Sequence, residues 1–206
     1  MEIFRLPIPD TLLIVPRRLT DLRGCFYESF KFDALSAMTG REFRLRQVNN
    51  SVSKRNVIRG IHSVVLPPGQ AKIVSCVRGA VQDFVVDLRL GSPAFGEYCE
   101  NRLDAESGES VFIAEGMGHA FLTLTDDTCV SYLCSSEFAP GTQIDLNPFD
   151  PGVGLPWKPA SEPTVSEKDA AAPTVREAAA RGLLPTYAEC REWYAQAGVR
   201  STGRLR

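Results

Sequence analysis

Short runs of β-branched and aromatic residues, separated by glycine turns, are the feature of this chain that most limits its fold. Two such runs fill residues 73–89 on either side of Arg78-Gly79, a spacing that predicts a β-hairpin. Similar runs follow at residues 111–113, 120–124 and 128–134. Many short strands with few helical periods predict a mainly β fold, either a β-sandwich or a jelly-roll barrel.

Helical signals are confined to two parts of the chain. One helix is expected at residues 32–38, with Gly40 at its end. A proline-rich, extended passage follows the last predicted strand. Beyond it, the Thr-x-x-Glu patterns at 174–177 and 186–189 match capping boxes, and they predict two short C-terminal helices.

The length and composition are those of an ordinary globular protein. The 206 residues are 44% hydrophobic and 23% charged, with a formal net charge of −2. This size fits a single domain over residues 1–206. Within it we expect a jelly-roll core with an N-terminal arm over 1–155, and an extended segment with a helical C-terminal region over 156–206.

Charge and hydropathy patterns argue against several kinds of partner. The chain has no basic run, which argues against binding to nucleic acid. No apolar stretch approaches the roughly 20 residues that cross a bilayer, so we expect no membrane partner. The N-terminus lacks the basic and apolar regions of a signal peptide, which predicts a cytoplasmic protein. The six cysteines never form Cys-x-x-Cys, so reduced thiols are expected rather than a zinc site.

The chain contains only two histidines, and a general base that titrates near neutral pH would be one of them. His62 lies in a strand-like segment between Arg59 and Lys72. Two nearby cations favour a neutral imidazole that can accept a proton, and they stabilise an oxyanion more than its parent ketone. This set predicts proton abstraction next to a carbonyl; the alternative is a core histidine bonded to a backbone carbonyl. Strand alternation separates Arg59 from His62, so the prediction requires a bulge or a twist near Gly60.

Three further side chains have two interpretations each. His119 follows a glycine turn, and is either a half-exposed histidine or a neutral donor to a substrate oxygen. Tyr132 is either a packing residue or a phenol that delivers a proton to the face opposite an imidazole base. Asp169 is either a carboxylate at a helix N-terminus or the group that orients His62. Two histidines without a His-x-His motif predict no metal site.

A series of short motifs resembles the cupin-type dTDP-4-dehydrorhamnose 3,5-epimerase family and its relatives in deoxysugar biosynthesis for natural products. The resemblance extends from about Thr20 to about Tyr187, and the order of the motifs makes it specific. The motifs are DLRG-x-F-x-E at 21–28, QVNNS at 47–51, RGIH at 59–62, AK at 71–72, VRG at 77–79, DLR-x-GSP-x-FG at 87–96, GHAF at 118–121, Tyr132, DP at 150–151 and SEKD at 166–169.

The resemblance implies a cupin-like jelly-roll β-barrel with short C-terminal helices, which forms a homodimer by exchanging N-terminal strands and needs no metal or organic cofactor. His62 would be the base, with Asp169 as its partner and Tyr132 as the acid. Lys72 would hold the C4 oxygen of the substrate as it becomes an enolate. The substrate-binding residues that the resemblance implies are Arg23, Phe26, Glu28, Gln47, Asn49, Arg59, His119 and Phe138.

Two positions depart from the family pattern: Ser63 stands where an aromatic residue is common, and Phe138 stands where tyrosine is expected. Both changes concern the substrate pocket more than the acid and base. We therefore expect an epimerase of a dTDP-4-keto-6-deoxyhexose that acts at C5 or at C3 and C5, by proton abstraction α to the C4 ketone and reprotonation on the opposite face. The alternatives are a 3-epimerase or 3,4-ketoisomerase of such a sugar, and a non-catalytic nucleotide-sugar-binding cupin.

Overall fold

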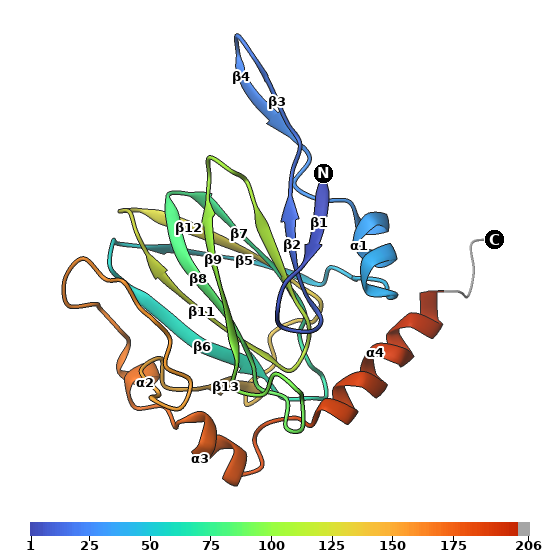
Figure 1. The fold of residues 1–206 in the computed structure, drawn as a ribbon, viewed down its shortest axis with the longest axis vertical. Helices are drawn as coiled ribbons and strands as arrows, with labels where there is room; N and C mark the ends of the chain where they lie inside the picture. The colour runs from blue at the N-terminus through green and yellow to red at the C-terminus, as the bar shows by residue number, and fades with distance from the viewer. Residues whose placement is uncertain (202–206) are drawn as a thin grey trace.

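Two antiparallel β-sheets that pack face to face form the body of the protein in the computed structural model, which describes residues 1–201 (Figure 1). The larger sheet has the strand order β1-β2-β10-β7-β12-β5, and the smaller has the order β13-β6-β11-β8-β9. The hairpin of β3 and β4 projects from the body (Figure 1). The strands are β1 (Glu2–Arg5), β2 (Thr11–Val15), β3 (Arg18–Asp21), β4 (Gly24–Tyr27), β5 (Gln47–Ser53), β6 (Ile58–Val64), β7 (Lys72–Arg78), β8 (Ala80–Asp87), β9 (Tyr98–Asp104), β10 (Ser110–Ile113), β11 (Met117–Thr123), β12 (Thr128–Cys134) and β13 (Gln143–Asp145).

The chain passes repeatedly from one sheet to the other, as in a jelly roll. The predicted mainly β, jelly-roll fold is confirmed, although the hydrogen-bonded ladders of the described residues form two sheets rather than a closed barrel. The predicted hairpin at Arg78-Gly79 is wrong. Strand β7 pairs with β10 and β12, whereas β8 pairs with β9 and β11. Gly79, at φ +81°, turns the chain across to the facing sheet, where a side chain would collide with Thr125 and Thr128.

Inward-facing apolar residues fill one half of the space between the sheets. Val74 and Val111 of the larger sheet pack with Val85 and Phe121 of the smaller one in a single buried cluster. Towards β5, β12 and β6 the inward-facing residues become polar. Alternation therefore produces a dry core on one side of the sandwich and a polar cavity on the other.

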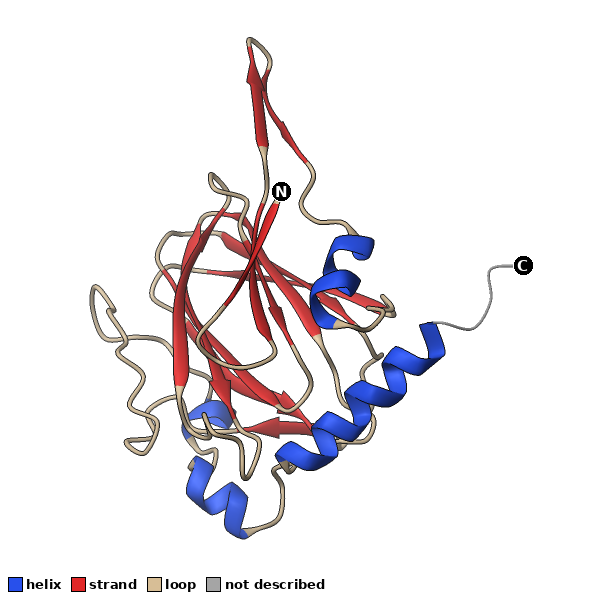
Figure 2. Ribbon diagram, turned by 45° about the vertical axis from the view of Figure 1, so that its right-hand side comes forward, coloured by secondary structure: helices blue, strands red, loops and turns tan. Residues whose placement is uncertain are grey.

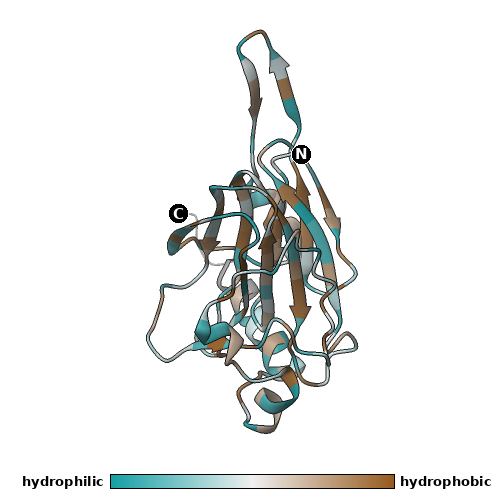
Figure 3. Ribbon diagram, turned by 90° about the vertical axis from the view of Figure 1, so that its left-hand side faces the viewer, coloured by the Kyte–Doolittle hydropathy of each residue, from teal (hydrophilic) through white to brown (hydrophobic). Residues whose placement is uncertain are grey.

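Helices and the C-terminal segment cover the outer faces of the sheets (Figure 2). Leu35 of α1 and Cys190 of α4 pack against Ile73 and Phe112 of the larger sheet. Val175 of α3 belongs to a second cluster on the outer face of the smaller sheet. Figure 3 shows hydrophobic residues concentrated in the strands of the body. The helices are α1 (Phe32–Thr39), α2 (Glu167–Ala170), α3 (Val175–Ala180) and α4 (Tyr187–Ser201).

The helix ends follow the sequence signals closely. Gly40 ends α1 in the left-handed conformation, with φ at +72°. Both predicted capping boxes form, because Glu177 and Glu189 each accept a hydrogen bond from the backbone of the threonine three residues before. Helix α2 has only four residues and contains Asp169, for which a helix N-terminus was one of the two interpretations. None of the described helices is both long and apolar enough to cross a membrane.

Candidate active site

A cavity of about 270 Å³ lies between the polar halves of the two sheets. Strands from both sheets contribute to its wall, and the segment after β12 forms its rim. Eight of the twelve candidate residues line it, whereas Asp169 lies directly behind His62. The lining residues are Gln47, Asn49, Asn50, Ser51, Arg59, His62, Ser63, Val64, Gln70, Lys72, His119, Phe121, Tyr132, Cys134, Glu137, Phe138, Thr142 and Gln143.

A bulge in β6 brings Arg59 and His62 to the same cavity. His62 is opposite His119 on β11, and Arg59 is opposite Phe121, so the two residues between them on β6 oppose a single residue of β11. Gly60 lies within this bulge with φ at +103°, and a side chain there would collide with the His119 carbonyl oxygen. The expected bulge near Gly60 is confirmed, and it explains why glycine is needed at this position.

His62 and Asp169 form a hydrogen-bonded pair. Asp169 Oδ1 accepts the hydrogen bond of His62 Nε2 at 2.8 Å, and Asp169 is only 4% exposed. Burial acts to raise the pKa of Asp169, but the hydrogen bond and charge of His62, together with Ser166 and the Gly60 amide, outweigh it, so the pKa of this carboxyl lies below its usual value. Both interpretations of Asp169 therefore hold: it lies in the first turn of α2, and it contacts His62.

Tyr132 reaches the cavity from the sheet opposite His62. It lies on β12 of the larger sheet, and its hydroxyl is 3.2 Å from Ser51 Oγ. Its ring meets that of His119 edge to face, with 6.0 Å between the centroids. Burial raises the pKa of Tyr132 well above its usual value, although the Ser51 hydrogen bond opposes this effect. The phenol therefore keeps its proton at neutral pH, as an acid must.

Cationic and hydrogen-bonding groups surround the space between these two side chains. Burial lowers the pKa of Lys72, and no ion pair within the described residues holds its ammonium group. Arg59 Nε donates to Ser53 Oγ at 3.0 Å. His119 is only 5% exposed, so the half-exposed interpretation is wrong; its Nε2 is bonded to buried Asp83 Oδ2 at 2.5 Å.

The remaining predicted cavity residues form the rim. Gln47 Nε2 donates to Asn49 Oδ1 at 2.7 Å, and Gln47 Oε1 accepts the backbone N–H of Phe138 at 2.7 Å. The Phe138 ring is exposed and available for stacking. The Ser63 hydroxyl donates to the Met117 carbonyl at 2.8 Å. Replacement of an aromatic residue by Ser63 therefore removes bulk near the base without leaving a free hydroxyl.

Three predicted substrate-binding residues do not reach this cavity. Arg23 and Phe26 lie on the projecting β3–β4 hairpin, and Glu28 follows it (Figure 1). Arg23 pairs with Asp21 at 2.5 Å, and Glu28 pairs with Lys31 at 3.0 Å. The structure separates these residues from the others because the hairpin points away from the body of its own chain.

Two carboxylates beside the histidines were not among the predicted site residues. Asp83 bonds His119, and Asp145 of β13 lies directly opposite His62 with its Oδ1 3.6 Å from Nε2. One ligand atom each of His62, Asp145 and Asp169 lies within 4.8 Å of the others, a spacing that a metal ion could bridge. However, His62 already bonds Asp169, and Asp145 pairs with Lys168 at 2.9 Å. The absence of a resident metal stays a prediction.

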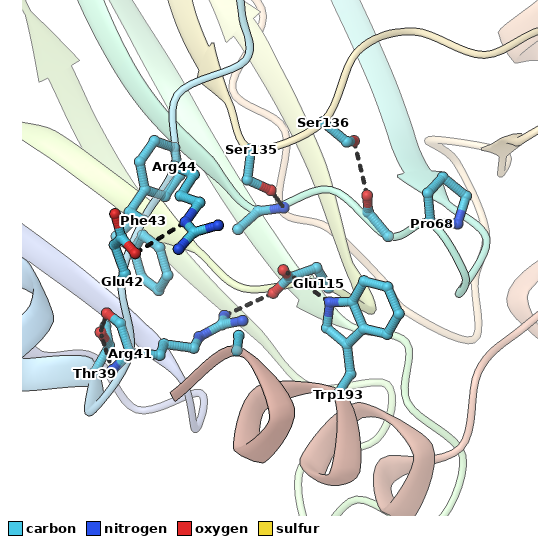
Figure 4. Close-up of a pocket in the computed structure, with 14 residues that line it drawn as sticks. Thr39, Arg41, Glu42, Phe43, Arg44, Pro68, Glu115, Ser135, Ser136 and Trp193 are labelled. Carbon is cyan, nitrogen blue, oxygen red and sulfur yellow. Dashed lines mark hydrogen bonds and ion pairs between the residues drawn. The ribbon is translucent and has the colours of Figure 1, made fainter. Parts of the chain in front are cut away.

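A second cavity, of about 190 Å³, lies between α4 and the larger sheet (Figure 4). Buried Arg41 pairs with Glu115 at 2.6 Å, and Trp193 Nε1 donates to the same carboxylate at 3.3 Å. The Arg41 guanidinium also lies 4.1 Å from the centroid of the Tyr194 ring. These contacts connect α4 to the larger sheet and hold it there.

Comparison with known proteins decides the family. A family model described as dTDP-4-dehydrorhamnose 3,5-epimerase matches residues 5–177. The chain belongs to this family. It is 48% identical to the dTDP-4-dehydrorhamnose 3,5-epimerase of Mycolicibacterium smegmatis over 177 residues, which cover 86% of this chain and 87% of that relative. The resemblance that the motifs indicated is confirmed, and members of this family are isomerases.

Two solved structures of family members share the whole architecture. The rmlC epimerase of Mycobacterium tuberculosis has a TM-score of 0.93 at 38% identity, covering 96% of this chain and 100% of that one. ChmJ, a 3'-monoepimerase from Streptomyces bikiniensis in complex with dTDP-quinovose, has a TM-score of 0.90 at 42% identity, covering 94% and 98%. The family thus includes enzymes that differ in how many carbons they epimerise.

Proposed function

We propose that this protein epimerises a dTDP-4-keto-6-deoxyhexose at C5, or at both C3 and C5, in deoxysugar biosynthesis for a natural product. The observation that supports this most directly is that the His62–Asp169 pair and the Tyr132 phenol enter one cavity from opposite sheets. Inversion at a carbon requires a base on one face and an acid on the other. The complex of ChmJ with dTDP-quinovose supports the nucleotide-sugar class of the substrate.

In this mechanism, His62 removes the proton α to the C4 ketone. Because its Nε2–H is donated to Asp169, the lone pair of the neutral ring is on Nδ1, which is the accepting atom. The Asp169 carboxylate then stabilises the imidazolium that forms. The electrons of the broken C–H bond move into the carbonyl, and an enolate results. Tyr132 returns a proton to the opposite face of the same carbon, and the ketone is restored.

The cations of the cavity stabilise the enolate oxygen. Arg59 lines the cavity from the same strand as His62, and Lys72 lines it from the larger sheet. His119 lines the cavity from β11. Charge that is fixed before the reaction stabilises a developing oxyanion without a cost of reorganisation. Lys72 is suited to this role because no carboxylate neutralises it within the described residues. The ketone itself receives the electron pair, so the steps above require no additional electron acceptor.

We further propose that the active unit is a homodimer. Arg23 and Phe26 are exposed on a hairpin that extends away from the body of its own chain (Figure 1). Neither residue lines the cavity of that chain. In a dimer related by two-fold symmetry, each hairpin would reach the cavity of the partner. Arg23 would then bind the diphosphate, while Phe138, Gln47 and Asn49 at the rim would bind the nucleoside end of the substrate.

The test is NMR spectroscopy of dTDP-4-keto-6-deoxyglucose with the protein in deuterated water. Loss of the C5 signal, or of both the C3 and C5 signals, with the chemical shifts of an inverted product is the expected result. Loss at C3 alone would assign a 3-epimerase, for which the likeness to ChmJ is a specific argument. Migration of the carbonyl would assign a 3,4-ketoisomerase. Binding without exchange, also with 2-deoxy and 3-amino congeners, would contradict the enzymatic proposal.

A further inference from the structure

The Nε2 atom of His62 faces two carboxylates rather than one. Asp169 Oδ1 lies at 2.8 Å from it and Asp145 Oδ1 at 3.6 Å. Asp145 is the direct cross-strand neighbour of His62, so its position is set by the pairing of β13 with β6. Two anions of equal effect next to one imidazole would favour the imidazolium, which cannot act as a base. For His62 to act as a base, another group must therefore compensate the charge of one of these two carboxylates.

Lys168 compensates the charge of Asp145. Its Nζ lies 2.9 Å from Asp145 Oδ2, while Gln143 Nε2 donates to Asp145 Oδ1 at 2.8 Å. The charge of Asp145 is thus balanced by a lysine, and its Oδ1 already accepts a hydrogen bond from a side-chain amide. Asp169, the residue that follows Lys168 in the chain, has no lysine or arginine partner among the described residues, so its charge acts on His62.

The same ion pair connects two elements that are too small to be stable by themselves. Helix α2 has four residues, and β13 has three residues and pairs only with β6 among the described strands. One turn of helix is unstable without external contacts. The Lys168–Asp145 pair joins α2 to β13, and the Asn147 side chain adds a hydrogen bond to the Ala170 carbonyl at 3.2 Å.

We propose that Lys168 and Asp145 are positioning residues for the base: Lys168 neutralises Asp145, which prevents Asp145 from holding a proton on the ring and leaves Asp169 as the carboxylate that orients His62. This inference rests on the proposed function, because it assigns a task to residues around the proposed base. It predicts that the two charges affect the His62 ring in opposite directions and that removing both restores the balance.

The other charged groups near His62 are the same in the wild-type protein and in the variants of Lys168 and Asp145 that test this proposal. Arg59 lies on the same strand, His119 is opposite on β11, and Lys72 and Tyr132 face the ring from the larger sheet. Because these groups are the same in every variant compared, differences between the variants report on the ion pair alone. The chain has two histidines, so the ring signals of His62 are identified by their absence from the spectrum of His62→Asn.

The experiment is an NMR titration of the His62 ring in the full chain without substrate. Lys168→Met leaves the Asp145 anion uncompensated beside Nε2, and should raise the titration midpoint by about one pH unit. Asp145→Asn removes that anion and should lower the midpoint. The double variant should return close to the wild-type midpoint, and Lys168→Arg should preserve it. The acid limb of kcat/KM should move in the same directions.

Lys158→Met is the matched control, because Lys158 forms an ion pair of 2.8 Å with Glu100 in which the lysine is similarly exposed. It should leave the midpoint unchanged. Single variants that shift the midpoint in the same direction, or not at all, would overturn the inference, as would a double variant that is displaced as far as either single one. Because the titration needs no substrate, a negative epimerase assay would not affect its outcome.

Discussion

His62 Nε2 lies 2.8 Å from Asp169 Oδ1, although 107 residues separate the two in the chain. The histidine comes from the bulge of β6, and the carboxylate comes from α2, which follows the last strand of the jelly roll. Since the carboxylate accepts the Nε2 hydrogen, it sets both the orientation and the tautomer of the ring. The proposed base is therefore complete only when the C-terminal segment has packed against the smaller sheet.

Replacement of Asp169 by asparagine should remove most of the activity. The amide has nearly the same shape, but its NH₂ group can donate to Nε2 and favour the wrong tautomer. We expect kcat to fall by about 10²- to 10⁴-fold with little change in KM. Steady-state kinetics on dTDP-4-keto-6-deoxyglucose would measure this. Asp126→Asn, at an exposed turn, is the control and should retain full activity. A fully active Asp169→Asn enzyme would contradict the proposed pair.

Tyr132→Phe should separate proton abstraction from inversion. Without the phenol, His62 can still remove and return a proton on its own face, so deuterium should enter the substrate with retention of configuration. We expect the inverted product to form about 10²- to 10⁴-fold more slowly. Ser51→Ala removes the neighbouring hydroxyl but keeps the phenol, and should have a much smaller effect. Equal loss of exchange and inversion would argue against an acid and a base on opposite faces.

The lowered pKa of Lys72 predicts an alkaline limit to activity. Burial favours the neutral amine, so the stabilising charge is lost at a lower pH than for an ordinary lysine, which titrates near ~10.4. The pKa of Tyr132 is raised, so the phenol is not responsible for this limb. In a pH profile of kcat/KM, activity should decline below the ordinary lysine range, and Lys72→Arg should move the decline to higher pH. An unchanged profile would exclude Lys72 as its source.

The same lysine should make the folded state less stable at neutral pH. Between its lowered folded pKa and its unfolded pKa, the unfolded chain binds more protons, so the free energy of unfolding rises with pH in that window. Lys72→Met should remove this slope and raise the melting temperature at neutral pH while it abolishes catalysis. Melting curves across neutral and alkaline pH would show this, with Lys54→Met at an exposed position as the control. A less stable Lys72→Met variant would contradict the expectation.

Local signals in the sequence predicted the elements better than their partners. Glycine turns and runs of β-branched residues located β7, β8, β10, β11 and β12, and the capping boxes located α3 and α4, because these features depend on residues near each other in the chain. The hairpin at Arg78-Gly79 failed because which strands pair depends on how the two sheets face each other. The turn residue marks a change of direction but does not specify the sheet that the chain enters.

In the candidate site, too, local signals identified some residues, whereas residues that depend on strand register could not be identified. Arg59, His62 and Lys72 could be selected because cations near a histidine are unusual in a strand-like segment. Asp83 and Asp145 could not, because each is an ordinary acidic residue until strand register places it beside a histidine. The glycines before His119 made a half-exposed histidine one of its two interpretations, but packing between the two sheets buries it.

The exposed position of Arg23 predicts that active sites are shared between subunits. Arg23→Ala and His62→Asn should each be weakly active alone, for different reasons. When the two are co-expressed, random pairing makes half of the dimers mixed, and each mixed dimer has one site with both native residues, so about a quarter of wild-type sites should be recovered. His62→Asn with Asp169→Asn is the control. Those two residues belong to the same chain, so no mixed site is complete and no activity should return. Activity of the Arg23→Ala and His62→Asn mixture equal to the mean of its components would show that Arg23 serves its own chain or none.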